Sequence, residues 1–420
     1  MADAADIDQG TTDKLDIVVF GATGFVGTLV AMHLAEHAPA VLRIGLAGRS
    51  TQKLEATRAE LGTAASRWPL IVADAADEDA LARLAAASKV IASTVGPYAK
   101  YGLPLVHACA AAGTDYLDLT GELLFVRESI DTAHRLAVDS GARIVHSCGF
   151  DSIPSDLGVL SLHERVQADG EGELTDTTLV VRALKGGLSG GTIDSLRTQI
   201  DAVSANRSLA KQLADPYALS PDRATEPRLA DEADSVGVGR DSALGGWTAP
   251  FVMAPYNTRI VRRSNALLDW AYGRRFRYRE VIGCGDSVVS PAVALAIAGG
   301  TWTAAAGLAF RPARRLVDRV LPDPGQGPSE RARATGYFTI EVHTTTTTGA
   351  RYVATVAAKG DPGYAATAVM MGQSALCLAI DRAALPQAAG VLTPATAMDS
   401  ALTRRLQNAG MTIAATPSDR

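Results

Sequence analysis

Residues 16–27 read DIVVFGATGFVG, and the organisation of the first domain follows from them. Residues 17–20 are an apolar, partly β-branched run without polar alternation, which is typical of a strand buried on both faces of a parallel sheet. Glycines then recur every third residue, and residues 28–37 have a helical pattern. Such a turn lets the backbone approach a pyrophosphate, which the free N–H groups of the helix can hold. The stretch predicts a nucleotide site formed by Gly21, Ala22, Thr23, Gly24, Phe25, Val26 and Gly27, with a glycine-rich surface turn as the alternative.

The alternation of strand and helix continues to residue 147. Further strands are expected at 41–47, 68–73, 89–95, 115–119 and 143–147, and helices at 51–61, 78–87, 103–112 and 123–140. Six strands alternating with helices indicate an α/β fold with a Rossmann-type, doubly wound parallel sheet. We assign residues 15–150 to this domain and residues 1–14 to a disordered tail.

Beyond residue 150 the strict alternation is lost. Strands are expected at 177–184, 337–346 and 352–358, and helices from residue 193 and at 365–379, while residues 215–250 look irregular. Strands grouped in this way suggest a second, α+β domain for substrate binding and oligomerisation at 151–387. Residues 388–420 are expected to return to the first domain.

The composition is that of a soluble globular protein. The chain has 420 residues, of which 47% are hydrophobic and 20% charged, and its net charge of -5 gives no electrostatic reason to expect nucleic acid as a partner. Its four cysteines lie far apart without a C-x-x-C pair. We therefore expect no metal site, no disulfide framework and a cytoplasmic location.

Residues 287–310 contain no Asp, Glu, Lys or Arg, and arginines follow at 311, 314, 315 and 319. The glycine pair at 299–300 is expected to split this segment into two helices. Helices packed in or on the second domain are one interpretation. Contact with the inner face of the plasma membrane is another, and a membrane span is a third.

The second strand ends in LAGRS, which bears on the choice of cofactor. A site for NAD usually has an acidic residue about twenty residues after the glycines, where it binds the ribose 2′-hydroxyl. Here Arg49 stands in that place, and a guanidinium favours a 2′-phosphate, with Ser50 as a further donor. The sequence predicts NADP(H), although a solvated arginine is the alternative. Asp74 is either an adenine contact or a helix cap, and the turn after the fourth strand adds Val95, Gly96 and Pro97 to the cofactor site.

Titratable side chains follow the fourth and sixth strands. Tyr98 is a candidate proton donor to an enolate, with a packing role as the alternative. HSCGFDSIPSD at 146–156 brings several such groups to the carboxyl edge of the sheet. Within it His146 suits the core and Asp156 a helix cap, as Glu122 suits a helix start. The candidate catalytic residues are Tyr98, Cys148 and Asp151.

The loop KGGLSGGT at 185–192 follows a strand and precedes a helix. Glycines there expose N–H groups that can bind a carboxylate or a thioester-linked phosphate. A flexible hinge is the competing interpretation. The candidate substrate loop comprises Gly187, Ser189, Gly190 and Gly191.

GATGFVG, LAGR, VGPY, GTDYLDLTGE at 113–122 and GFDSIPSD at 149–156 together resemble the saccharopine dehydrogenase-like oxidoreductases. GGLSGGT at 186–192, PDPGQGPS at 322–329 and KGDPGYAATAVM at 359–370 are similar to the actinobacterial trans-acting enoyl reductases within that family. The resemblance implies an NADP(H)-binding domain and a second α/β domain. It also implies reduction of a carbon–carbon double bond left by a polyketide synthase, during assembly of phthiocerol-type lipids and phenolic glycolipids.

The expected reaction is hydride transfer from NADPH to the β-carbon of an α,β-unsaturated acyl thioester. Expected partners are a lipid or acyl-thioester substrate presented by a polyketide synthase, a second copy of the chain and, through 287–310, a membrane surface. No paired basic cluster for two carboxylates is apparent, which argues against formation of saccharopine itself. The alternatives are an imine or ketone reductase and a non-catalytic, lipid-associated NADP-binding protein.

Overall fold

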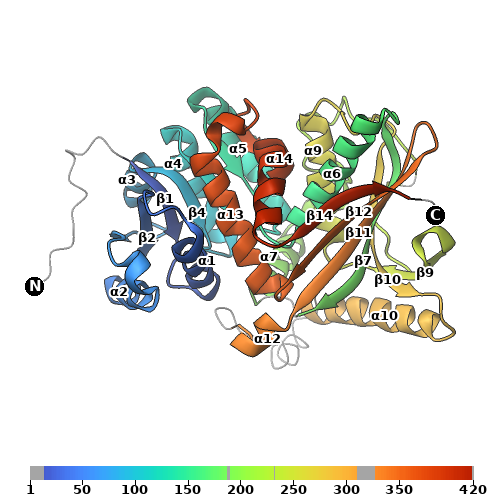
Figure 1. Cartoon of the computed structure of the whole chain (residues 1–420), viewed down its shortest axis with the longest axis horizontal. Helices are drawn as coiled ribbons and strands as arrows, with labels where there is room; N and C mark the ends of the chain where they lie inside the picture. The colour runs from blue at the N-terminus through green and yellow to red at the C-terminus, as the bar shows by residue number, and fades with distance from the viewer. Residues whose placement is uncertain (1–13, 187–189, 231, 310–326, 419–420) are drawn as a thin grey trace, which may run out of the picture.

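The structure, a computed structural model, describes residues 14–186, 190–230, 232–309 and 327–418 (Figure 1). Most of the expected N-terminal tail lies outside the described residues, as do the arginines at 311–319 and two members of the candidate substrate loop, Gly187 and Ser189. Figure 1 shows one sheet toward each end of the longest dimension, with α13 (Thr367–Ile380) and α14 (Pro394–Asn408) between them.

The first sheet has seven parallel strands in the order β13-β6-β5-β4-β1-β2-β3. Their bounds are Gly390–Leu392, Arg143–Val145, Asp115–Asp118, Ser88–Ser93, Leu15–Phe20, Ile44–Gly48 and Leu70–Val72 in the same order. The chain reverses direction across the sheet after β3, which places the switch point between β1 and β4. The expected doubly wound α/β fold is thus confirmed, with one strand more than the six predicted.

Helices cover both faces of this sheet. They are α1 (Phe25–His37), α2 (Thr51–Glu60), α3 (Glu78–Ala86), α4 (Tyr98–Ala112) and α5 (Leu123–Ser140), with the 3₁₀ turn η1 at Gly62–Ala65. One apolar layer lies under α3, α4 and α5. The opposite layer lies under α1 and also under α13, a helix from the late part of the chain. The expected helix at 103–112 begins five residues earlier, at Tyr98.

The second sheet is mixed and has the order β14-β12-β11-β7-β10-β9-β8. The bounds of its strands are Thr412–Pro417, Arg351–Lys359, Tyr337–Thr346, Leu174–Lys185, Arg277–Gly285, Gly246–Pro250 and Gly239–Asp241. Only β7 and β10 are parallel neighbours. This sheet confirms the α+β character of the second half, but β8 and β9 lie within 215–250, which the sequence pattern had marked as irregular.

The helices α6 (Ile153–Asp169), α9 (Ala254–Leu267) and α14 pack together on one face of the second sheet or beside it. The remaining elements are α7 (Gly190–Ala205), α8 (Ser208–Ala214), α10 (Ser290–Ala309) and α12 (Glu330–Ala334), with short turns η2 (Ser242–Leu244), η3 (Pro362–Ala366) and η4 (Arg382–Ala384). After residue 387 the chain enters both sheets, through β13 and then β14. The expected domain boundaries stay predictions.

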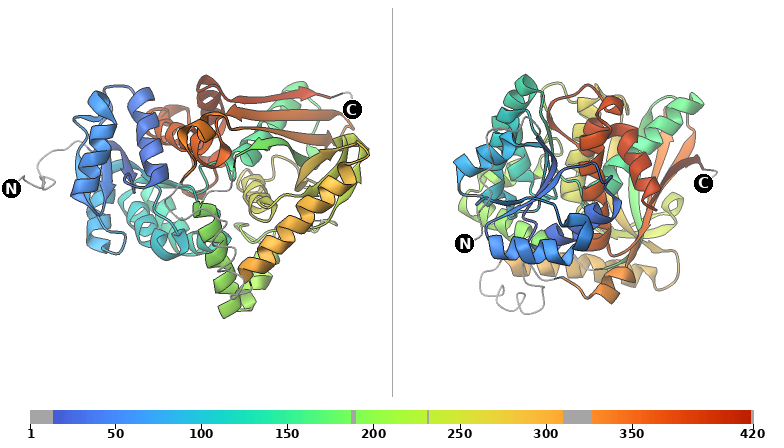
Figure 2. Two further views of the ribbon diagram at one scale, coloured as in Figure 1. Left: turned by 90° about the horizontal axis from the view of Figure 1, so that it is seen from below. Right: turned by 60° about the vertical axis from the view of Figure 1, so that its left-hand side comes forward.

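Within the uncharged segment, residues 290–309 form one continuous helix, α10, so the predicted break at the glycine pair is wrong. Apart from the nearby backbone of the helix itself, no heavy atom of the described residues lies within 4 Å of the place where a Cβ would stand on Gly299 or Gly300. Because the helix surface is open there, no tertiary contact forces a bend. Figure 2 shows α10 running along the outside of the second sheet, with the green helices α7 and α8 at one end.

Candidate active site

The glycine turn after β1 is built for close approach of a ligand. Gly21 has a left-handed φ of +87°, and a Cβ on it would lie 2.7 Å from Thr94 Oγ1. A Cβ on Gly27 would lie 2.1 Å from the carbonyl oxygen of Gly21, so helix and strand pack with no room for a side chain. The N-cap residue of α1 is Gly24, which has no side chain that could cap the helix. The first N–H groups of α1 are therefore available to a phosphate, and the cradle fits a dinucleotide.

Arg49 and Ser50 stand where β2 meets α2, beside the glycine turn. The Arg49 side chain is exposed and makes no hydrogen bond with the part of the chain that the structure describes. Ser50 Oγ accepts a hydrogen bond of 3.4 Å from the backbone N–H of Lys53 and so caps α2. Asp74 is exposed, and its Oδ1 accepts from the N–H of Ala76 at 2.9 Å, whereas Asp77 is the cap of α3.

A cavity of about 900 Å³ extends from the glycine turn into the second half of the molecule. Predicted cofactor and catalytic residues that line it are Gly24, Phe25, Val26, Gly27, Gly96, Pro97, Tyr98 and Asp151, together with Gly191 of the substrate loop. Gly21, Ala22, Thr23, Arg49, Ser50, Asp74, Val95, Cys148 and Gly190 are not part of its wall. The deeper wall is largely apolar and includes Ile200, Val203, Leu213, Phe251, Val252 and Ile282.

A motif late in the chain, residues 359–370, meets the glycine turn at this cavity. The ring of Phe25 packs edge-on against Tyr364, with the ring centroids 5.0 Å apart. Asp361 caps η3 by accepting from the N–H groups of Tyr364 and Ala365, both at 3.1 Å. The Tyr364 hydroxyl accepts from the N–H of Gly190 at the start of α7. The segment 359–370 thus joins the cofactor turn to the substrate loop.

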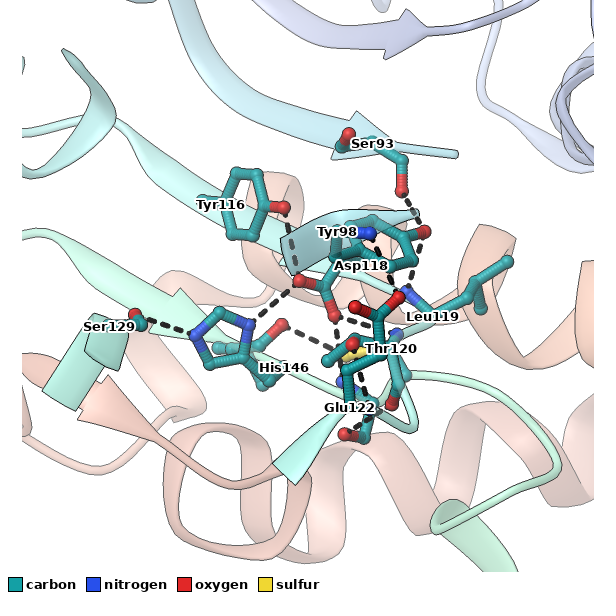
Figure 3. Close-up of polar contacts among 12 residues, drawn as sticks. Ser93, Tyr98, Tyr116, Asp118, Leu119, Thr120, Glu122, Ser129 and His146 are labelled. Atoms are coloured by element: carbon teal, nitrogen blue, oxygen red, sulfur yellow. Dashed lines mark hydrogen bonds and ion pairs between the residues drawn. The ribbon is translucent and has the colours of Figure 1, made fainter. Parts of the chain in front are cut away.

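The Tyr98 ring lines the cavity, but its hydroxyl group bonds to the backbone. It donates to the carbonyl oxygen of Ser93 at 3.0 Å and accepts from the N–H of Leu119 at 3.3 Å (Figure 3). Burial raises the pKa of the phenol well above its ordinary value. This geometry favours the packing interpretation of Tyr98 over the role of proton donor.

Glu122 was expected at a helix start, and the structure shows which helix it caps. Its Oε1 accepts from the N–H of Tyr98 at 2.9 Å, and its Oε2 accepts from the N–H of Ala99 at 2.8 Å (Figure 3). Ser195 Oγ on α7 donates a third hydrogen bond at 2.7 Å. Although Glu122 directly precedes α5, its carboxylate serves α4.

Asp118, at the end of β5, organises the buried side of the site (Figure 3). Its Oδ2 bonds to Tyr116 Oη at 3.0 Å and to His146 Nδ1 at 2.7 Å. Its Oδ1 accepts from the N–H groups of Thr120 and Ser147, both at 3.0 Å. His146 is fully hydrogen-bonded, since its Nε2 contacts Ser129 Oγ at 2.8 Å. These contacts fix the turn after β6, where Ser147 has a left-handed φ of 65°.

Cys148 and Asp151 differ in their access to the cavity. Cys148 has no exposed surface, and burial raises the pKa of its thiol well above the ordinary value, so no nucleophilic thiolate is favoured. Asp151 lines the cavity, and burial raises the pKa of its carboxyl to about 6. Its Oδ2 lies 3.7 Å from where a Cβ on Gly121 would stand. Asp151 is thus a carboxylic acid that holds its proton up to about pH 6 and faces the cavity.

Sequence reasoning missed Tyr256, which lines the cavity from α9. Its hydroxyl forms a short hydrogen bond with Ser147 Oγ, and Ser147 Oγ also donates to the carbonyl oxygen of Thr120 at 2.9 Å. No motif marks Tyr256, and more than a hundred residues separate it from Ser147. Only the packing of α9 against the first sheet brings the two together.

The charges around the cavity limit what it can bind. Among the described lining residues the charged side chains are Asp151 and Asp194, and no Lys or Arg is present. A substrate with two carboxylates would find no cationic partner among the described residues of this wall. Within the described ranges, no group of three or more His, Cys, Asp and Glu side chains could hold a metal ion.

Comparison with known proteins agrees with this geometry. Residues 17–145 match the model of the saccharopine dehydrogenase NADP binding domain. A Mycobacterium tuberculosis protein provisionally named trans-acting enoyl reductase is 55% identical over 414 residues, which are 97% of this chain and 98% of that protein. The trans-acting enoyl reductase of Mycobacterium bovis is 51% identical over 412 residues, covering 96% and 98% of the two chains.

A solved structure shares the fold over nearly the whole chain. The apo saccharopine dehydrogenase (L-Glu forming) of Saccharomyces cerevisiae superimposes with a TM-score of 0.53 and 13% sequence identity. The match covers 96% of this chain and 99% of the yeast chain. At this identity the likeness concerns the fold alone.

Proposed function

Since this chain belongs to the family of trans-acting enoyl reductases and carries an NADP-binding domain of the saccharopine dehydrogenase type, we propose that it reduces an α,β-unsaturated acyl thioester made by a polyketide synthase. The product would be a precursor of a phthiocerol-type lipid or a phenolic glycolipid. The chain itself is an NADP-dependent oxidoreductase of the enoyl reductase type.

The cavity is the observation that carries the proposal. It joins the glycine turn to an apolar wall without Lys or Arg among its described lining residues. A neutral acyl chain is compatible with such a wall, because burying apolar groups is favourable and no unpaired charge is left. An amino acid and a keto acid would each bring a carboxylate without a partner. The same cavity therefore disfavours formation of saccharopine or reduction of an amino-acid imine.

Bound NADPH supplies the hydride that forms the new C–H bond at the β-carbon. The chain must then deliver a proton to the α-carbon, and Asp151 is the titratable cavity group suited to that step. Because burial holds its pKa at about 6, a useful fraction of the carboxyl is protonated near neutral pH. After the transfer, Asp151 regains a proton from solvent. We assign it the role of general acid and leave Cys148 out of the proposed catalytic set.

Arg49 is assigned to recognition of the 2′-phosphate. It lies exposed beyond the end of β2, with Ser50 and the exposed Lys53 nearby in sequence. A guanidinium can contact a phosphate with two parallel hydrogen bonds, which no ribose hydroxyl can match. This arrangement supports a preference for NADPH over NADH.

Helix α10 is assigned to contact with lipid. Two helices in the described chain are long and apolar enough to cross a membrane, but they differ in burial. In the most apolar 18-residue window of Pro362–Ile380, 72% is buried and the stretch belongs to the core, whereas in that of Ser290–Leu308 only 17% is buried. Thr301 of α10 also lines the cavity, so an apolar surface leads to the site. A helix lying on a membrane surface would suit a lipid substrate.

The decisive experiment combines purified enzyme with NADPH and 2-enoyl thioesters of increasing chain length. Oxidation of NADPH with formation of the saturated thioester, faster for longer chains, is the expected result. Turnover of keto acids with amino acids, and none of enoyl thioesters, would contradict the proposal. In cells, deletion of the gene should leave lipids that lack two hydrogens, and complementation should restore the saturated form.

A further inference from the structure

Tyr256 lines the cavity, and its hydroxyl group bonds directly to that of Ser147, which is not itself a lining residue. Ser147 follows β6 of the first sheet, and Tyr256 belongs to α9, which packs beside the second sheet. Both side chains are buried, and Tyr256 is 6% exposed through the cavity that it lines. The pair therefore joins the two halves of the molecule at the site.

The direction of this hydrogen bond follows from the proton count. Ser147 has a single hydroxyl proton and donates it to the carbonyl oxygen of Thr120 at 2.9 Å. Tyr256 must then donate its own proton to Ser147 Oγ in this arrangement. If Ser147 instead turns its proton toward Tyr256, it gives up the bond to the Thr120 carbonyl oxygen, and the phenol proton is free to point into the cavity. Two rotations of O–H bonds thus convert a closed pair into a donor that faces a ligand.

Six other hydroxyl groups on the wall lack this freedom. Their acceptors are carbonyl or carboxylate oxygens, which can accept a proton in a hydrogen bond but never donate one back. This holds for Thr94, Tyr98, Ser195, Ser204, Thr301 and Thr367. A hydroxyl that turned away from such an acceptor would gain no donor in its place. In the Ser147–Tyr256 pair, by contrast, the acceptor is itself a hydroxyl group and can become the donor.

The backbone around Ser147 is held in place for this task. Its φ of 65° lies in the left-handed region, which a serine rarely adopts without support. The support is the bond from its N–H to Asp118 Oδ1, and Asp118 is in turn fixed by Tyr116 and His146. This network aims Ser147 Oγ at Tyr256. Asp118 is a positioning residue that acts through Ser147.

We propose that Tyr256 is a catalytic residue whose phenol O–H donates a hydrogen bond to the carbonyl oxygen of the acyl thioester, with Ser147 as its supporting donor. The proposal rests on the enoyl reductase function above. When the hydride forms the C–H bond at the β-carbon, the π electrons move to the carbonyl oxygen and give an enolate. Tyr256 stabilises that negative oxygen without losing its proton. The electrons return to form the α-carbon–hydrogen bond with the proton of Asp151, and the carbonyl is restored.

The environment keeps Tyr256 in the form that this role needs. Burial raises the pKa of the phenol well above its ordinary value, and the nearby carboxyls of Asp118 and Asp151 add to the rise. A phenol with a raised pKa stays protonated and remains a donor. Preorganised donors at a developing oxyanion act strongly because they need no reorganisation during the reaction.

The test compares Tyr256→Phe with Tyr272→Phe, using the full-length enzyme, NADPH and a 2-enoyl thioester. Tyr272 is also fully buried, but it does not line the cavity, and its hydroxyl has no hydrogen-bond partner among the described residues. We expect Tyr256→Phe to lower kcat about 100-fold and to leave the dissociation constant of NADPH within about twofold. Tyr272→Phe should match the wild type in both.

An isotope effect separates a role in chemistry from a defect in folding. With NADPH deuterated at the transferred position, Tyr256→Phe should show a larger deuterium isotope effect on kcat, because hydride transfer becomes slower than product release. A smaller folded fraction would lower the rate and leave the isotope effect unchanged. Wild-type kcat and isotope effect in Tyr256→Phe would overturn the proposal.

Two further outcomes are informative. If the wild type fails to reduce any enoyl thioester, the proposed function fails and this inference fails with it. If the wild type is active and Tyr256→Phe is equally active, the inference alone fails. Should Tyr256→Phe not fold, Ser147→Gly takes its place, because glycine tolerates the left-handed φ. A rate about tenfold lower with a raised isotope effect then supports the inference, and a wild-type rate overturns it.

Discussion

The carboxylate of Glu122 caps the helix that begins at Tyr98, through hydrogen bonds of 2.9 Å and 2.8 Å to the first two N–H groups of that helix. The first helix of the domain, α1, has no side-chain cap from its N-cap residue. Two helices at the same edge of the sheet thus differ in their free N–H groups. A phosphate finds donors at α1 that no side chain of the described residues caps, while at α4 a protein anion already holds them.

Replacing Glu122 with Gln should destabilise the fold. The amide keeps one acceptor oxygen but turns its NH₂ group toward the second backbone N–H. One of the two buried hydrogen bonds to α4 is therefore lost, and two donors face each other in its place. We expect a loss of about 2 kcal/mol in the free energy of unfolding, measured by urea denaturation. Glu128→Gln, on the exposed side of α5, is the matched control and should be neutral. Equal stability of the two variants would show that the cap contributes little.

Arg49→Glu should weaken the binding of NADPH far more than that of NADH. The substitution removes a partner of the 2′-phosphate and adds a repulsive charge, whereas NADH has only a hydroxyl there. We expect the dissociation constant of NADPH to rise about 100-fold and that of NADH to change less than threefold. The control is Arg67→Glu. Arg67 is also exposed, but it precedes β3 and so lies near the amino ends of the strands, whereas Arg49 follows the carboxyl end of β2. Equal weakening of both cofactors by Arg49→Glu would refute the assignment.

Six strands of the first sheet could be predicted from the sequence because they alternate with helices along the chain. The run at 17–20 and its glycine turn are local signals of this kind. β13 could not be found in this way, since Gly390–Leu392 is too short to show a pattern and pairs with β6, far away in the chain. The chain thus supplies one strand of the first sheet from its last part.

The residues of the candidate site likewise fall into those that local sequence signals predict and those that depend on long-range packing. Asp151 and the glycine turn follow directly from strand ends, where the carboxyl edge of a parallel sheet collects ligands. Tyr256 could not be predicted, because its place in the cavity depends on how α9 packs against the first sheet. Tyr98 is a residue that the sequence suggested for the site and the structure disfavours. Its position suggested a proton donor, but its hydroxyl donates that proton to the carbonyl oxygen of Ser93.

The pH dependence of turnover should report on Asp151. As general acid it must carry its proton, and its pKa is raised to about 6, so kcat/KM should fall as pH rises through that value. Asp151→Asn cannot protonate carbon and should lower kcat at least about 100-fold, and its remaining activity should lose this limb of the profile. Tryptophan fluorescence across the same pH range checks that folding is constant. A wild-type profile in Asp151→Asn would remove the residue from the mechanism.

Exposed apolar side chains on α10 should govern association with lipid. Leu295 is 63% exposed, and Val289, just before the helix, is 64% exposed. The double variant Val289→Ser and Leu295→Ser should lower the fraction of protein that floats with phospholipid vesicles several-fold, because apolar area available to the membrane is lost. Val41→Ser changes a side chain that is 83% exposed on the first domain and should float like the wild type. Flotation that the α10 variant does not alter would count against contact through this helix.

The buried carboxyl of Glu280 should make the fold less stable as pH rises. It accepts from Tyr278 Oη at 2.8 Å and from Asn257 Nδ2 at 3.0 Å, yet burial raises its pKa from 4.5 to about 7. Because the folded state then binds the proton more tightly than the unfolded state, the free energy of unfolding falls between about pH 4.5 and pH 7. The shift corresponds to about 3 kcal/mol.

Glu280→Gln isolates that contribution, since the amide has nearly the same shape and cannot titrate. Other carboxyls titrate in both proteins, so the quantity to measure is the difference in unfolding free energy between wild type and variant from pH 5 to pH 8. We expect this difference to move in favour of the variant as pH rises and to level off above about pH 7, where Glu280 is ionised. Glu60→Gln, at the exposed end of α2, should show no such trend. A difference that stays constant with pH would mean that Glu280 has the same pKa in the folded and unfolded chains.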